Sequence, residues 1–336
     1  MRRYVITPGE GIDGLKLVEA ERPSPARGQV LVKMHAGSLN FRELLMVNGQ
    51  YPGGSGEPVV PLSDGAGEVI EVGADCTRFK VGDRVAGAFM QGWTGGGVVD
   101  ADIPTALGGA IDGVLTEYRV FEESGLVSIP DHLSYEEAAT LPCAAVTAWN
   151  ALYGLTTLKP GQTVLTLGTG GVSIFALQFA VAAGARVIAT SSSDEKLARA
   201  RELGAAETIN YRTHEDWDQE VRRLTNGRGV DTVVEVGGPG TLARSIASTA
   251  RDGSVQLIGV LSMAEIDPLP ILTGGVMVRG FMVGSREMFE AMNRAIAVNG
   301  LRPVIDRSFA FEEAADAFRY LASAAHFGKV VIRIAS

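Results

Sequence analysis

The sequence predicts an α/β protein of two domains, in which a β-rich domain precedes a doubly wound parallel sheet. The chain has 336 residues, which is more than a single hydrophobic core usually organises. Residues 163–193 follow the pattern strand, glycine turn, helix, strand. Beyond residue 193, short apolar strands alternate with helical segments, as in a parallel sheet that is covered by helices.

The composition excludes several classes of protein. Hydrophobic residues make up 46% of the chain and charged residues 21%, as in ordinary globular domains. The net charge of −9 argues against a nucleic-acid partner, because phosphates require a basic surface. No stretch of 18 apolar residues predicts a membrane span, and the first residues lack the apolar core of a signal peptide. Two cysteines exclude a disulfide framework and fit a reducing cytoplasm.

Residues 163–193 have the features of a dinucleotide site. Residues 163–167 are apolar and β-branched, as expected of a buried parallel strand. Gly168 permits a tight turn, and Gly170 allows the backbone to approach a pyrophosphate, which the next helix attracts with unpaired N–H groups. Ser173, at the sixth position of the G-x-G-x-x-G pattern, is small enough to let helix pack on strand. Gly184 ends the helix. The alternative is a plain glycine turn without a ligand.

The residues after the second strand indicate which nucleotide binds. An NAD site places a carboxylate about 20 residues beyond the glycines, where it accepts hydrogen bonds from the ribose. This chain instead offers Ser191, Ser192 and Ser193, followed by Lys196. Hydroxyl groups and a cation suit a 2′-phosphate, and we interpret Asp194 as a first-turn residue that complements the helix dipole. The sequence therefore favours NADP(H).

Strand and helix signals extend over the rest of the chain. In the first domain we expect strands at residues 29–35, 64–72, 83–88 and 115–121, and a loop at 90–112. Residues 134–137 (SYEE) resemble an N-terminal cap that leads into a helix over 138–152. In the second we expect helices at 193–203, 216–225 and 287–299, and strands at 207–211, 231–236, 254–260 and 276–283. Residues from 302 onward predict strand, helix and strand that fold back onto the first domain. The expected domains are 1–128 with 301–336, and 129–300.

Seven segments together resemble a known family. They are residues 36–52 (AGSLNFRELLMVNGQYP), 61–73 (PLSDGAGEVIEVG), 79–85 (FKVGDRV), 141–152 (LPCAAVTAWNAL), 168–173 (GTGGVS), 234–238 (VEVGG) and 326–334 (HFGKVVIRI). The chain is similar to the medium-chain dehydrogenase/reductase superfamily, in its zinc-independent, quinone oxidoreductase-like branch. The resemblance implies a GroES-like catalytic domain, a Rossmann cofactor domain and an active site in the cleft between them.

The resemblance also implies that no catalytic zinc is bound. Zinc-dependent relatives use Cys, His and Cys at positions that correspond here to Asn40, Ser63 and Cys143. Amide and hydroxyl groups are poor zinc ligands compared with thiolate and imidazole. No cysteine occurs in residues 90–112, where those relatives carry a structural zinc lobe. We interpret Cys143 as a small buried residue.

Without a metal to polarise the substrate, hydrogen-bond donors must do so. In related enoyl reductases a Tyr in the matching G-x-Y-P segment is implicated in protonation, which makes Tyr51 the leading candidate. The amide of Asn40 is suited to hold an oxygen that gains charge. The alternatives are a loop aromatic at Tyr51 and a turn-capping amide at Asn40.

Further site residues follow from the resemblance. Arg42 and Asp64 are expected to form an ion pair, while Phe41, Asp64, Phe89 and Trp93 are candidates for the substrate pocket or, for the aromatic residues, ordinary core positions. The candidate cofactor residues are Thr147, Gly168, Gly170, Gly171, Val172, Ser191, Ser192, Ser193, Lys196, Tyr211, Gly237, Gly259 and Lys329. For Lys196 and Lys329 the alternative is a solvated surface lysine.

These observations predict an NADPH-dependent oxidoreductase that transfers hydride to quinones or α,β-unsaturated carbonyl compounds. Two alternatives remain open: a zinc-free, NAD(P)-dependent alcohol dehydrogenase or aldehyde reductase, and a non-catalytic NADPH-binding structural or RNA-binding protein. The apolar strand at Val276–Val283 predicts a sheet edge, and relatives dimerise through such strands, so we expect a homodimer.

Overall fold

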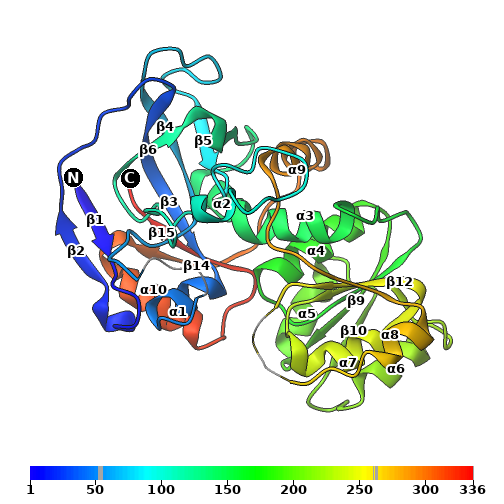
Figure 1. Cartoon of the computed structure of the whole chain (residues 1–336). Coiled ribbons are helices and arrows are strands. Elements are labelled where there is room, and N and C mark those ends of the chain that lie inside the picture. The colour runs from blue at the N-terminus through cyan, green and yellow to red at the C-terminus, as the bar shows by residue number, and fades with distance from the viewer. Residues whose placement is uncertain (52–55, 260, 262–263, 336) are drawn as a thin grey trace. The chain divides into compact units, whose positions relative to one another are not determined.

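The computed structural model describes residues 1–51, 56–259, 261 and 264–335 (Figure 1). The chain divides into two compact units. Unit 1 comprises Met1–Val146 and Gly284–Ser336, and unit 2 comprises Thr147–Val283. The boundaries expected from the sequence, at 128 and 301, fall inside unit 1. The difference arises because residues 129–146 and 284–300, although helical, pack with the β-rich part of the chain.

Unit 1 is built on a seven-stranded sheet in the order β14-β15-β3-β4-β5-β7, with β6 paired to β3. Its strands are β3 (Gln29–Leu39), β4 (Asp64–Val72), β5 (Arg84–Gly87), β6 (Tyr118–Glu122), β7 (Leu126–Ser128), β14 (Ile305–Ala310) and β15 (Lys329–Arg333). β1 (Arg2–Val5) and β2 (Lys16–Glu19) form a separate pair. β15 pairs antiparallel with β3. The C-terminal segment therefore returns to the first domain, as predicted.

The helices of unit 1 are α1 (Phe41–Val47), α2 (Tyr135–Ala139), α9 (Arg286–Asn299) and α10 (Ala314–Ala322). The predicted cap is confirmed, because Ser134 Oγ accepts a hydrogen bond from Glu137 N and the Glu137 carboxylate accepts one from Ser134 N. The single helix expected over 138–152 is wrong. It is divided into α2, a π-helical turn at Leu141–Ala145 and α3 (Val146–Tyr153), and Pro142, which lacks an N–H group, lies in that turn.

Unit 2 contains a six-stranded sheet in which every pairing is parallel. Its strands are β8 (Thr163–Thr166), β9 (Arg186–Ser191), β10 (Glu207–Asn210), β11 (Val230–Glu235), β12 (Thr249–Leu257) and β13 (Met277–Gly280). Its helices are α3, α4 (Gly171–Ala182), α5 (Asp194–Glu202), α6 (Trp217–Leu224), α7 (Pro239–Ser248) and α8 (Leu269–Gly274). The doubly wound fold predicted from the sequence is confirmed.

The strand order β10-β9-β8-β11-β12-β13 reverses direction at β8. β9 and β10 follow on one side of β8, and β11 to β13 lie on the other. Dinucleotides bind at the carboxyl ends of the strands at such a switch point, with one half on each side. Among the described residues, no helix is long and apolar enough to cross a membrane.

Candidate functional site

The glycine turn between β8 and α4 leaves an open cradle at the switch point. Gly168 has a φ of +71°, a conformation that other residues rarely adopt. Gly170 has an ordinary φ of −76° and precedes α4, and no side chain caps the helix there. A Cβ atom at either glycine would meet no atom of the described residues within 4 Å. Nothing in the surrounding protein therefore requires glycine at position 170, whereas a pyrophosphate at the start of α4 would.

The residues around the turn fix its shape. Ser173 is buried, and its Oγ donates a hydrogen bond to Leu167 O at 2.7 Å. Gly168 N donates to Thr190 Oγ1 at 3.2 Å, so the turn is tied to β9 as well. The serine at the sixth position thus anchors α4 to the end of β8. Gly171 and Val172 form the first turn of α4.

The three serines after β9 have different environments. Ser191 is buried, and its Oγ accepts a hydrogen bond from Ser193 N at 3.3 Å. Ser193 Oγ accepts from Lys196 N at 3.3 Å and so caps α5. Ser192 lies between them and is half-buried. Tyr211 N donates to Ser191 O at 3.1 Å, which places Tyr211 beside the end of β9.

Asp194 lies in the first turn of α5, as expected. Its Oδ1 also accepts a hydrogen bond from Asn210 Nδ2 at 2.7 Å.

The other cofactor candidates of unit 2 lie away from β9. Gly237 and Gly259 lie in the loops that follow β11 and β12, on the other side of the switch point. Thr147 is buried in α3. Residue 260, the last residue of the strand expected at 254–260, lies outside the described residues.

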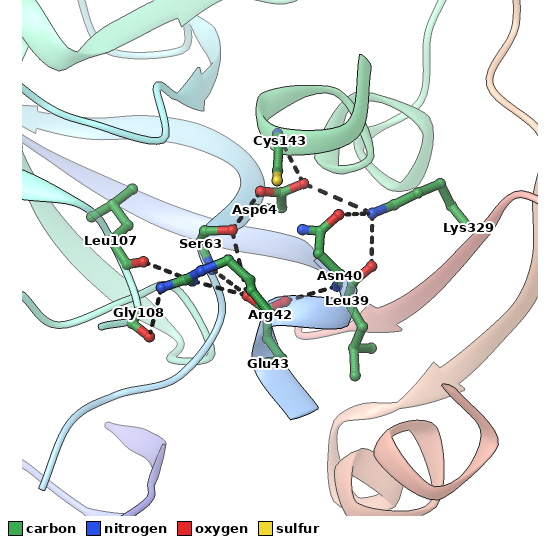
Figure 2. Close-up of polar contacts among 10 residues, drawn as sticks. All are labelled: Leu39, Asn40, Arg42, Glu43, Ser63, Asp64, Leu107, Gly108, Cys143 and Lys329. Atoms are coloured by element: carbon green, nitrogen blue, oxygen red, sulfur yellow. Dashed lines mark hydrogen bonds and ion pairs between the residues drawn. The ribbon is translucent and has the colours of Figure 1, made fainter. Parts of the chain in front are cut away.

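Unit 1 contains a polar cluster, which we define as Asn40, Arg42, Glu43, Ser63, Asp64, Cys143 and Lys329 (Figure 2). Strand pairing brings these residues together. Ser38 of β3 is paired with Asp64 of β4, and Leu39 of β3 is paired with Val330 of β15. The end of β3 and the start of α1 therefore lie beside the first residues of both neighbouring strands.

Lys329 is the centre of one half of the polar cluster. Only 2% of the residue is exposed, and its Nζ donates to Leu39 O at 2.7 Å and to Asn40 Oδ1 at 2.5 Å. The interpretation of Lys329 as a solvated lysine is wrong. Asp64 Oδ2 lies 3.9 Å from the ammonium group. The lysine also fixes the Asn40 amide, because only Oδ1 can face the ammonium group.

Arg42 is the centre of the other half. Its Nη1 bonds Glu43 Oε1 at 3.1 Å and Leu107 O at 3.1 Å. The expected Arg42–Asp64 ion pair is therefore wrong, because Arg42 pairs with Glu43 and Asp64 faces Lys329 (Figure 2). Sequence reasoning missed Glu43 because it did not predict α1. The signal was the carboxylate three residues after Asn40, which accepts from Asn40 N at 2.8 Å.

The Arg42 guanidinium also lies between two aromatic rings. It is 4.5 Å from the centre of the Tyr51 ring and 4.9 Å from that of Phe89, within the range of cation–π attraction. Of the other candidates for the pocket, Phe41 is 44% exposed and begins α1. Trp93 is buried, and its Nε1 donates to Gly96 O at 3.0 Å.

The polar cluster balances two carboxylates against two cations. Burial raises the pKa of Asp64, and the charge of Lys329 opposes this change. Burial likewise raises the pKa of Glu43, which Arg42 opposes. Ser63 links the two acids, since its Oγ donates to Asp64 Oδ1 at 2.7 Å and its N donates to Glu43 Oε1 at 3.3 Å. Burial, followed by the charge of Asp64, raises the pKa of the Cys143 thiol, which disfavours the thiolate.

Comparison with known proteins identifies the family of each part of the chain. Residues 26–131 match the alcohol dehydrogenase GroES-like domain family, and residues 171–297 match the zinc-binding dehydrogenase family. A zinc-type alcohol dehydrogenase-like protein of Schizosaccharomyces pombe is 46% identical over 99% of both chains.

Two solved structures cover the whole fold. An NAD-dependent alcohol dehydrogenase is 32% identical over 100% of both chains, with a TM-score of 0.88. A quinone oxidoreductase of Pseudomonas syringae is 30% identical over 99% of both chains, with a TM-score of 0.83. These relatives show that the protein is an NAD(P)H-dependent oxidoreductase. With its GroES-like segment, its Rossmann sheet and a relative of this similarity along its full length, the chain belongs to the medium-chain dehydrogenase/reductase superfamily.

Proposed function

We propose that this oxidoreductase uses NADPH to reduce quinones or α,β-unsaturated carbonyl compounds without a catalytic zinc ion. The observation that carries the proposal is the polar cluster. At the three positions that correspond to the zinc ligands of relatives it has an amide, a hydroxyl group and a thiol. In addition, the ammonium group of Lys329 donates a hydrogen bond to the amide oxygen of Asn40.

The residues present do not fit a zinc ion. Asn40 and Ser63 offer neutral oxygen and nitrogen atoms, whereas zinc sites are built from thiolate, imidazole and carboxylate. Burial raises the pKa of the Cys143 thiol, so the form that would bind a metal is disfavoured. The buried ammonium group near Asp64 would repel a cation at the same place. Among the described residues, no group of three His, Cys, Asp or Glu side chains is arranged to hold a metal ion.

Tyr51 is the leading proton donor. The bound nucleotide supplies the hydride, and the protein has to orient the substrate and provide a proton as its oxygen gains charge. Tyr51 is half-buried, and the guanidinium of Arg42 holds its ring in place. Asn40, whose amide Lys329 fixes, would not give up a proton but would hold the substrate oxygen as it gains charge. Its Nδ2 is buried with no acceptor in hydrogen-bonding geometry among the described residues, so this N–H donor is the part of the amide left to hold a substrate oxygen.

The preference for NADPH rests on the end of β9. Ser191, Ser192 and Ser193 occupy the strand end where an NAD site would have a carboxylate, and Tyr211 lies next to the same strand end. Asp194 is tied to Asn210, which turns this carboxylate toward β10. Hydroxyl groups together with Lys196 would receive a 2′-phosphate, while the open cradle at Gly170 would receive the pyrophosphate.

A second candidate function is the reduction of simple carbonyl compounds. It is favoured by a relative named NAD-dependent alcohol dehydrogenase, which is 32% identical, and by one named zinc-type alcohol dehydrogenase-like protein, which is 46% identical. The absence of zinc ligands at Asn40 and Ser63 weighs against it, since a simple aldehyde or alcohol depends more on a Lewis acid than a quinone does. The alternative of a non-catalytic protein has no support from these relatives.

The proposed homodimer forms through β13. This strand is at the end of the six-stranded sheet, where its second edge has no partner among the described residues. Met277 is 44% exposed and Met282, just beyond the strand, is 47% exposed. An apolar edge of this kind is suited to pair with a second copy of the same edge.

The first experiment tests metal independence together with substrate class. Purified protein treated with a strong chelator should contain no stoichiometric zinc and should still oxidise NADPH with a quinone or an enone. Activity on the matched saturated aldehyde should be much lower, because its oxygen depends on stronger activation. Activity that requires stoichiometric zinc would contradict the proposal, and turnover of the aldehyde alone would favour the second candidate.

Replacement of the proton donor should slow the reaction step. The Tyr51→Phe variant should lower kcat on an enone about 100-fold, the usual scale of general acid catalysis, with little change in NADPH affinity. The matched control is Tyr320→Phe, which removes a hydroxyl group bonded to Asp306 Oδ2 at 2.7 Å and should keep full kcat. An unchanged kcat in Tyr51→Phe removes this residue from the mechanism.

A carboxylate in the β9 loop should reverse the choice of nucleotide. In the Ser192→Asp variant we expect the Kd for NADPH to rise at least about tenfold, or about 1.4 kcal/mol, through charge repulsion. The Kd for NADH should fall or stay the same, since a carboxylate accepts hydrogen bonds from the free ribose. Titration with both nucleotides measures this, and Ser124→Asp in unit 1 is the control. Equal losses for both nucleotides would argue against a phosphate site here.

Charge on the sheet edge should separate the subunits. Analytical ultracentrifugation should show a dimer for the unaltered protein and a monomer for a variant with both Met277→Glu and Met282→Glu, because paired like charges repel across the interface. Val298→Glu places the same charge at a residue of α9 that is 86% exposed and should leave the dimer intact. A wild-type protein that is monomeric at all concentrations excludes this interface.

A further inference from the structure

Glu235 is a buried carboxylate at the end of β11 that binds several parts of unit 2. The residue is 0% exposed. Its Oε1 accepts hydrogen bonds from Gly237 N at 2.7 Å, Gly238 N at 3.0 Å and Thr241 Oγ1 at 2.7 Å. Its Oε2 accepts one from Ser245 Oγ. Each of the four contacts is a donor, which matches a group that can only accept.

The same residue also holds the loop after the next strand. The backbone oxygen of Glu235 accepts from Ile258 N at 2.9 Å and from Gly259 N at 3.1 Å. The two loops are in close backbone contact, because a Cβ atom at Gly259 would lie 1.8 Å from Val236 O. Glu235 therefore fixes the loops that follow both β11 and β12.

Glu235 also decides which helix end is available to an anion. Its carboxylate accepts from the N–H groups of Gly237 and Gly238, the two residues that precede α7, and from the hydroxyl group of Thr241 in the first turn, so it lies where the helix dipole favours negative charge. The start of α4 has no such side chain. Of the two helix ends at the switch point, the protein closes α7 with its own charge and leaves α4 open. A phosphate at α7 would be repelled, so the pyrophosphate is directed to α4.

We propose that Glu235 is the positioning residue for the nicotinamide half of the cofactor. The cradle and the serines of β9 would receive the pyrophosphate and the adenosine half on one side of β8. The other half then lies over the ends of β11 and β12, where Glu235 holds Gly237, Gly238 and Gly259. This inference requires a nicotinamide dinucleotide, but it is independent of the substrate, of zinc and of the preference for NADPH.

The test compares the whole cofactor with its adenosine fragment. In Glu235→Ala, we expect the Kd for NADPH to rise at least about tenfold, and the Kd for 2′,5′-ADP to change by less than about twofold, because only the nicotinamide half loses its support. If NADH binds better than NADPH, the same comparison is made with NADH in place of NADPH and 5′-AMP in place of 2′,5′-ADP. The control is Asp231→Ala at the opposite end of β11, which removes a carboxylate bonded to Thr163 N at 2.8 Å and should leave both Kd values unchanged.

Glu235→Gln is the second variant and carries the test if Glu235→Ala does not fold. It keeps the shape of the side chain but removes its charge and turns one of its two acceptor oxygens into an NH2 donor, and the Kd for the whole cofactor should rise about threefold while that of the fragment stays constant. Equal changes for cofactor and fragment, or no change for the cofactor, would overturn the proposal. A substrate screen that fails to find an enone or quinone would disprove the proposed function and leave this test unaffected.

Discussion

The antiparallel pairing of β3 with both β4 and β15 is the constraint on which the polar cluster depends. Asn40, Asp64 and Lys329 are far apart in the sequence and belong to three segments, yet each is at or next to the end of a strand in this pairing. The buried charges then balance one another in pairs. Leaving one buried charge without its partner typically costs about 3–5 kcal/mol, so the cluster is also a strong constraint on which residues these strand ends can carry.

In unit 2, the reversal of strand order at β8 has the corresponding role. The sheet alone would offer two equivalent helix ends, those of α4 and α7, to an anionic ligand. Glycine at position 170 leaves one end open, and a glutamate closes the other. The fold supplies a general place for a dinucleotide, while a few side chains determine where its charged part can lie.

The sequence predicted the elements whose signals are local. The glycine pattern predicted the β8–α4 turn, the capping residues predicted the start of α2, and the run at 64–72 predicted β4 with its observed bounds. The resemblance added Asn40, Ser63 and Cys143 as one group, and the structure places Asn40 and Cys143 around Asp64 and Lys329.

The errors concern contacts between distant segments. Arg42 and Asp64 were expected to pair because both lie near the same site, but the pairing of strands places Lys329 beside Asp64 and leaves Glu43 for Arg42. α1 was missed because seven residues, Phe41–Val47, are too short to show a clear helical period. Glu235 was read only as part of a strand, because its donors come from two glycines after β11 and from two hydroxyl groups of α7, a helix that the sequence did not predict.

The position of Arg42 links two loops of unit 1. Its guanidinium bonds the carbonyl oxygens of Leu107 and Gly108 and at the same time stacks on the ring of Tyr51. Gly108 has a φ of +66°, and a Cβ atom there would lie 2.6 Å from the backbone of Leu62, so this anchor cannot shift easily. A change of backbone at residues 107–108 would therefore also disturb the contact of Arg42 with the Tyr51 ring, and the two segments have to be altered together.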